Sequence, residues 1–130
     1  MKGYLLDTNV ALLAVNTPER LSPAINTTLI EQGPTFLSVI SFWEVMIKAM
    51  KGKLDVGDPR QWWRETIDAL GVTTLLYRPE HIAEVYHLPP IHQDPFDRAL
   101  IAQAIAEDLT LVTIDDSISR YASDRLRIIQ

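Results

Sequence analysis

Short apolar segments alternate with amphipathic segments along the chain, and this alternation restricts the fold more than any other feature. The apolar segments are four or five residues long, which suits buried strands, whereas the amphipathic segments have helical length and periodicity. Strands separated by helices require crossover connections, so the pattern predicts a parallel sheet covered on both faces, a three-layer α/β/α sandwich. The expected strands are residues 3–6, 34–38, 72–76, 110–114 and 126–129, and the expected helices are residues 8–15, 23–32, 41–52, 59–71, 79–86, 95–107 and 117–122.

Helix boundaries follow from local signals. Asp94-Pro95 combines a preferred N-cap with proline at the first helical position, and Ser22-Pro23 and Asp58-Pro59 repeat the pattern. Ser41 and Glu44 have the spacing of a capping box, which predicts that a helix begins there.

Length, composition and charge exclude several classes of protein. A length of 130 residues fits one domain, expected to span residues 1–130. The chain has no cysteine, which excludes disulfide scaffolds, thiolate metal sites and a cysteine nucleophile. Asp7 interrupts the first apolar segment, and no apolar run approaches the ~20 residues of a membrane span, so we expect a cytoplasmic protein. Because the net charge is −5, the chain as a whole does not attract nucleic acid, which would have to be bound by a few Arg or Lys side chains or through a bound cation.

Acidic residues gather where a parallel sheet places its ligand site, beyond the carboxyl ends of the strands. Asp7 follows the first expected strand, and Asp115 follows the fourth. Such a concentration of like charge is costly unless a hard divalent cation neutralises it. The carboxylates expected to converge at this edge are Asp7, Glu44, Asp97, Asp115 and Asp116.

Each of these residues also has a structural interpretation. Asp7 and Asp94 are suitable N-caps, Glu44 suits the capping box, and Asp97 complements a helix dipole. Asp115 and Asp116 suit a strand-to-helix turn. Structural or surface roles are favoured for His81, His87 and His92, whose spacing matches no zinc signature. The helix dipole alone would explain Lys48, Lys51 and Lys53, and a secondary role in contacting phosphates stays open for them.

Two long motifs resemble the VapC-type toxin ribonucleases of the PIN-domain family. The chain reads Leu5-Leu6-Asp7-Thr8-Asn9 near its start. Later it reads His92-Gln93-Asp94-Pro95-Phe96-Asp97-Arg98-Ala99-Leu100-Ile101-Ala102-Gln103-Ala104, followed by Leu111-Val112-Thr113-Ile114-Asp115. With residues 38–45 between them, these segments resemble the family in order and spacing over almost the whole chain.

The resemblance implies a metal-dependent endoribonuclease with sheet order 3-2-1-4-5. Its acidic quartet falls on Asp7, Glu44, Asp97 and Asp115, which would hold Mg²⁺ or Mn²⁺. Such a cation would activate water and stabilise the charge that develops on the phosphate. Asp116 lies beside the last acid of the quartet as a tentative further ligand, and the accessory polar positions are Asn9, Ser38, Asp94 and Thr113.

The resemblance also implies partners. Proteins of this kind commonly form homodimers and bind an antitoxin whose tail lies in an apolar groove. Trp43, Met46 and Met50 supply more apolar surface than one core requires, and we expect them to line that groove. RNA is the implied substrate, and no membrane association is expected.

Two other functions stay open from the residues. In a catalytically inactive PIN-like interaction module, the acids would serve as caps and the apolar helices would bind a partner. A phosphotransfer enzyme, either a haloacid-dehalogenase-like phosphatase or a receiver domain, also places an aspartate after a parallel strand. The phosphatase motif requires Asp-x-Asp where this chain has Asp7-Thr8-Asn9, and both enzymes require a late lysine, whereas none follows Lys53.

Overall fold

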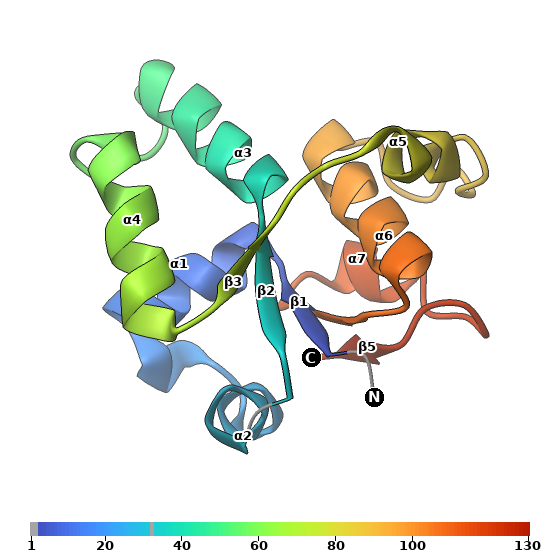
Figure 1. Cartoon of the computed structure of the whole chain (residues 1–130), viewed down its shortest axis with the longest axis horizontal. Helices are drawn as coiled ribbons and strands as arrows, with labels where there is room; N and C mark the ends of the chain where they lie inside the picture. Colours follow the sequence, from blue (N-terminus) through green and yellow to red (C-terminus); the bar gives the residue numbers. More distant parts are fainter. Residues whose placement is uncertain (1–2, 32) are drawn as a thin grey trace.

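The computed structural model describes residues 3–31 and 33–130, and these residues form a five-stranded sheet (Figure 1). Every pair of neighbouring strands is parallel, in the order β3-β2-β1-β4-β5. This order confirms the topology that the resemblance implies. The strands are β1 (Tyr4–Leu6), β2 (Thr35–Ser38), β3 (Thr73–Leu75), β4 (Thr110–Val112) and β5 (Ile128–Ile129).

Helices cover both faces of the sheet, as the alternation of segments predicts. In Figure 1, α1, α3 and α4 lie on one side of the strands, and α5, α6 and α7 lie on the other. The α-helices are α1 (Thr8–Asn16), α2 (Pro23–Glu31), α3 (Val39–Met50), α4 (Pro59–Leu70), α5 (Pro79–Val85), α6 (Pro95–Glu107) and α7 (Asp116–Ser119), and a 3-10 helix, η1, spans Pro18–Arg20. Among the helices of the described residues, none is long and apolar enough to cross a membrane.

Two apolar cores result from the alternation of side chains along the strands. Leu5 of β1 belongs to the core that packs against α6, with Leu100 and Ile101. Leu6, the next residue, belongs to the opposite core, with Val10 of α1 and Leu37 of β2. Successive residues of a strand face opposite sides of a sheet, so one short strand anchors both outer layers.

Most helices begin at the caps that the sequence indicates. The Asp94 carboxylate accepts hydrogen bonds from the backbone N–H groups of Phe96 and Asp97 at 2.8 and 3.1 Å. At the end of α4, Gly71 adopts a left-handed conformation, with φ of 63°. A residue with a side chain would be strained there, which explains the helix stop.

The start of α3 corrects one expectation. The capping box of Ser41 and Glu44 is wrong, because Ser38 caps the helix and its hydroxyl accepts the N–H of Ile40 at 3.0 Å. The chain passes from β2 into α3 without a loop, so Glu44 lies in the second turn. The sequence analysis also missed η1, and the expected helix end at Gln32 lies outside the described residues.

Candidate active site

Three carboxylates from separate elements share one electrostatic environment. Asp7 follows β1, Glu44 lies on α3, and Asp97 lies in the first turn of α6. The negative charges of Glu44 and Asp97 both raise the pKa of Asp7, and Glu44 also raises the pKa of Asp97. The parallel sheet therefore brings together three of the acids that the sequence indicates, near its carboxyl edge.

Asp7 is the most buried of these acids, with 2% of its surface exposed. One carboxylate oxygen caps α1 by accepting the N–H of Val10 at 2.8 Å, and the other accepts the hydroxyl of Thr113. Burial raises the pKa of Asp7 to about 6 despite the opposing effect of these hydrogen bonds. Asp7 therefore both caps α1 and forms part of the candidate site.

Asp97 is held by a histidine from the loop that precedes α6. The Nε2 atom of His92 lies 2.7 Å from Oδ2 of Asp97. Burial raises the pKa of Asp97 to about 6, with a further increase from the charges of Asp94 and Glu44, whereas the His92 hydrogen bond lowers it. Tyr121 secures the loop, because its hydroxyl accepts the backbone N–H of His92 at 2.9 Å.

Glu44 is buried and has polar partners on both oxygens. Its Oε1 lies 2.6 Å from the hydroxyl oxygen of Thr8, which lies 2.9 Å from that of Ser41. Because a carboxylate only accepts and Thr8 has one hydroxyl hydrogen, Thr8 donates to Glu44 and accepts from Ser41. Oε2 accepts from the Nζ atom of Lys48 at 2.6 Å. That hydrogen bond raises the pKa of Lys48, with smaller increases from Asp94 and Asp97.

Asp115 and Asp116 are placed differently from these three. The carboxylate of Asp115 caps α7 by accepting the N–H of Ser117 at 2.8 Å. Its backbone N–H donates to the hydroxyl of Thr113 at 3.0 Å, so Thr113 links Asp115 to Asp7. Asp116 is exposed, and its carboxylate accepts from the side-chain amide of Gln130 at 2.6 Å.

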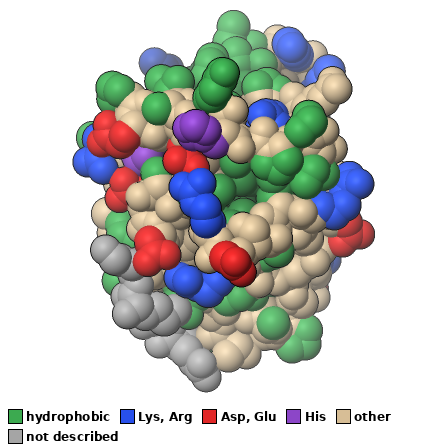
Figure 2. All heavy atoms as spheres, turned by 90° about the vertical axis from the view of Figure 1, so that its right-hand side faces the viewer, with side chains coloured by type: hydrophobic (Ala, Val, Ile, Leu, Met, Phe, Trp, Pro, Cys, Tyr) green, Lys and Arg blue, Asp and Glu red, His purple; other side chains and the backbone are tan. Residues whose placement is uncertain are grey.

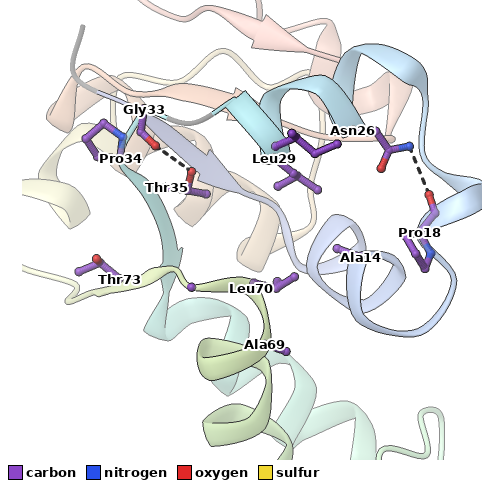
Figure 3. Close-up of a pocket in the computed structure, with 12 residues that line it drawn as sticks. Ala14, Pro18, Asn26, Leu29, Gly33, Pro34, Thr35, Ala69, Leu70 and Thr73 are labelled. Carbon is purple, nitrogen blue, oxygen red and sulfur yellow. Dashed lines mark hydrogen bonds between the residues drawn. The ribbon is translucent and has the colours of Figure 1, made fainter.

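A pocket of about 600 Å³ lies away from these carboxylates, at the amino ends of β2 and β3 (Figure 3). Figure 3 shows Pro34 and Thr35 from the start of β2 facing Leu70 and Thr73 across it. Its lining residues carry no ionisable side chain. The acidic group, not this pocket, therefore holds the residues suited to acid–base or metal chemistry.

Sequence comparison places the chain in a family. A model of the PIN domain matches residues 4–124. The chain belongs to the PIN domain family. No curated protein matches it in sequence.

Solved structures share this PIN fold over nearly their whole length. A chain of VapBC2 from Rickettsia felis, bound to a promoter DNA fragment, is 19% identical, with 98% of this chain and 97% of that chain covered and a TM-score of 0.70. DNA-bound VapBC from Salmonella typhimurium is 17% identical, with 99% and 98% covered and a TM-score of 0.73. VapBC-5 from Mycobacterium tuberculosis, from the VapBC family of toxin–antitoxin systems, is 15% identical, with 100% and 99% covered and a TM-score of 0.66. At these identities the likeness concerns the fold.

The donor set of this PIN domain fits a hard divalent cation. Asp7, Glu44 and Asp97 supply carboxylate oxygens, the ligands that Mg²⁺ and Mn²⁺ prefer. Burial and mutual repulsion raise the pKa values of Asp7 and Asp97, and a nearby cation would relieve that repulsion. His92, Asp94 and Asp97 also offer ligand atoms that all lie within 4.8 Å of one another.

Of the remaining residues singled out from the sequence of the PIN domain, Asp94 acts on this group, because it accepts the backbone N–H of Asp97 and its charge raises the pKa of Asp97. Asn9 is exposed in the first turn of α1, whereas Ser38 and Asp94 cap α3 and α6. No role in the site was predicted for Thr8, Ser41 or His92, and for Lys48 the sequence left open a phosphate contact but did not predict the contact with Glu44. Of these, Lys48 had a usable signal, because it follows Glu44 by four residues on one helix face.

An apolar hollow of about 250 Å³ lies on α3 of the PIN domain, the helix that also carries Glu44. Its lining residues are Val39, Phe42, Trp43 and Met46. Trp43 is 59% exposed although its ring packs edge-on against Phe96 of α6, with centroids 5.2 Å apart. Met50 is 76% exposed and lies outside the hollow. Trp43 and Met46 therefore line an apolar hollow, whereas Met50 lies outside it, and an antitoxin groove at this place stays a prediction.

Proposed function

We propose that this PIN domain is a metal-dependent endoribonuclease and acts as the toxin of a VapBC-type pair. The observation that carries the proposal is the placement of Asp7, Glu44 and Asp97 by three separate elements near the carboxyl edge of the sheet, where the charges of Glu44 and Asp97 raise the pKa of Asp7. PIN domains are generally nucleases, and the solved structures with this fold include VapBC assemblies. RNA as the substrate rests on the motif resemblance, as does the role of toxin.

Asp7, Glu44 and Asp97 would hold Mg²⁺ or Mn²⁺, with Asp115 completing the acidic quartet. Asp116 stays a tentative ligand, since its carboxylate is exposed and bonded to Gln130. The bound cation would supply positive charge that stabilises the developing phosphorane and favours deprotonation of the attacking water.

The chain's own polar residues orient the carboxylates before substrate arrives. Thr113 fixes one oxygen of Asp7, Thr8 fixes one oxygen of Glu44, and His92 fixes one oxygen of Asp97. Groups that are already oriented need no reorganisation during the reaction, which lowers the barrier. Asp97, the least buried of the three acids, is the side chain that we expect to orient the attacking water.

An apolar segment of an antitoxin would occupy the hollow around Trp43 and Met46, and Met50 would extend the contact along α3. From there a partner's tail could reach the acids, because Trp43 packs against Phe96, which lies with Asp97 in the first turn of α6. A homodimer is also part of the proposal. Acidic, basic and apolar side chains are interspersed on the face shown in Figure 2, and the described residues of that face form no continuous basic surface. We therefore expect RNA phosphates to bind this chain locally, through the metal ion.

Cleavage of total cellular RNA by the purified, antitoxin-free protein tests the proposal. We expect discrete fragments with Mg²⁺ or Mn²⁺, none with EDTA, and none from Asp97→Asn. Asp68→Asn, which changes an exposed carboxylate on α4, is the matched control and should cleave like the wild type. Cleavage that survives both EDTA and Asp97→Asn would contradict the carboxylate mechanism. A folded protein that cleaves none of the RNA would favour the catalytically inactive interaction module.

A further inference from the structure

One basic side chain, Lys48, already contacts a carboxylate of the candidate site. The Nζ atom of Lys48 is 2.6 Å from Oε2 of Glu44. Asp94 and Asp97 also act electrostatically on this ammonium group, so it lies in the combined field of the acids. The nuclease mechanism proposed above leaves this lysine without a role, although its contact is with a proposed metal ligand.

The contact of Lys48 limits how Glu44 can bind a metal ion. Thr8 donates to one oxygen of Glu44 and Lys48 donates to the other. A divalent cation that uses Oε2 would meet a positive charge beside it, and repulsion between the two disfavours simultaneous binding. Either the ammonium group leaves or the cation binds more weakly.

Lys48 is able to leave, because its position is at the rim of the site. Its side chain is 39% exposed, whereas that of Glu44 is 4% exposed. Lysine has a long flexible stem and a strongly hydrated head, so a rotamer that places the ammonium group in water is accessible once the contact with Glu44 is given up. Glu44 has no such freedom, since it is buried and fixed by Thr8.

We propose that Lys48 competes with the divalent cation for Glu44 and thereby sets the cation concentration at which the site fills. This inference rests on the proposed function, because it requires that Glu44 is a metal ligand. In the metal-free protein, Lys48 compensates the charge of the buried Glu44 carboxylate. When the cation binds, the ammonium group moves into solvent.

Metal binding by metal-stripped protein tests the proposal without measuring activity. Calorimetric titration with Mn²⁺ should give binding about tenfold tighter for Lys48→Met than for the wild type. A tenfold change corresponds to about 1.4 kcal/mol, which is the size expected for giving up one charged hydrogen bond between a partly exposed lysine and a buried carboxylate. Lys48→Arg keeps the charge and should bind no tighter than the wild type. Lys51→Met removes an exposed charge from the end of the same helix and should change the affinity less than twofold.

A second measurement uses the wild-type chain, so it does not depend on the folding of Lys48→Met. Addition of Mg²⁺ should shift the side-chain Nζ or Cε NMR resonance of Lys48 and leave that of Lys51 in place. Unchanged affinity in folded Lys48→Met, or saturation with Mg²⁺ without a shift at Lys48, would overturn the inference and leave the nuclease proposal intact. A wild-type protein that binds neither metal would overturn both.

Discussion

Replacing Asp7 by asparagine is expected to stabilise the metal-free protein at neutral pH. The pKa of this buried carboxyl is about 6 in the fold and 3.8 for the unperturbed group. At 1.36 kcal/mol per pH unit, the difference corresponds to about 3 kcal/mol of destabilisation once Asp7 is ionised in both states. Asparagine carries no charge and caps a helix about as well as aspartate, so α1 should persist.

The sign of the pH dependence follows from the raised pKa. Between about pH 4 and 6 the folded state binds a proton at Asp7 that the unfolded state has lost. The stabilisation from this proton is fully present below pH 3.8 and is lost as the pH rises through 6. Asp7→Asn has no such proton, so its advantage over the wild type should grow from pH 4 to 6 and stay constant above.

Urea unfolding in EDTA at pH 4.5, 5.5 and 7.5 measures this advantage. Asp68→Asn is again the matched control and should unfold like the wild type at each pH, because Asp68 is exposed. The reasoning is refuted if Asp7→Asn is no more stable than the wild type at pH 7.5, or if its advantage does not change with pH.

Three further changes have defined outcomes. Thr113→Val removes the donor to Asp7 and should lower the free energy of unfolding by about 2 kcal/mol in urea at pH 7.5; an unchanged value would contradict the contact. Gly71→Ala places a side chain at φ of 63° and should cost about 1 kcal/mol in the same assay, whereas no loss would contradict the left-handed cap. His92→Ala should raise the pKa of Asp97 in a carbon-13 NMR titration, because it removes a hydrogen bond that lowers this pKa; an unchanged pKa would argue against that bond.

The general architecture was predictable from the sequence because it depends on the alternation of segments. Each expected strand has a counterpart in the sheet, and the strand order follows the family resemblance. The approach of Asp7 and Asp97 was also predictable, since one follows a strand and the other opens a helix at the same edge. Position along the chain relative to strand ends is sufficient for this level of detail.

The partners of the acids were not predictable in the same way. Ser38 and Ser41 are both suitable caps for α3, and the structure places the helix start at Ser38 because β2 continues directly into the helix. The loop that carries His92 to Asp97 is held by Tyr121, far along the chain, and by Arg98 of α6. Such contacts depend on tertiary packing, which local patterns do not contain.

The contact between Lys48 and Glu44 was missed for a different reason. Its spacing from Glu44 on α3 indicates an ion pair, but the helix dipole explained the lysine equally well. The distinction depends on burial. Because Glu44 is directed into the molecule and Lys48 lies at the rim, their contact belongs to the candidate site and not to an exposed helix face.

A crystal structure of the protein soaked with Mn²⁺, with anomalous diffraction used to locate the metal, tests the central claim most directly. We expect manganese within coordination distance of oxygens from Asp7, Glu44 and Asp97, with the ammonium group of Lys48 turned away from Glu44. Manganese bound only by His92, Asp94 and Asp97, or only elsewhere on the protein, would contradict it.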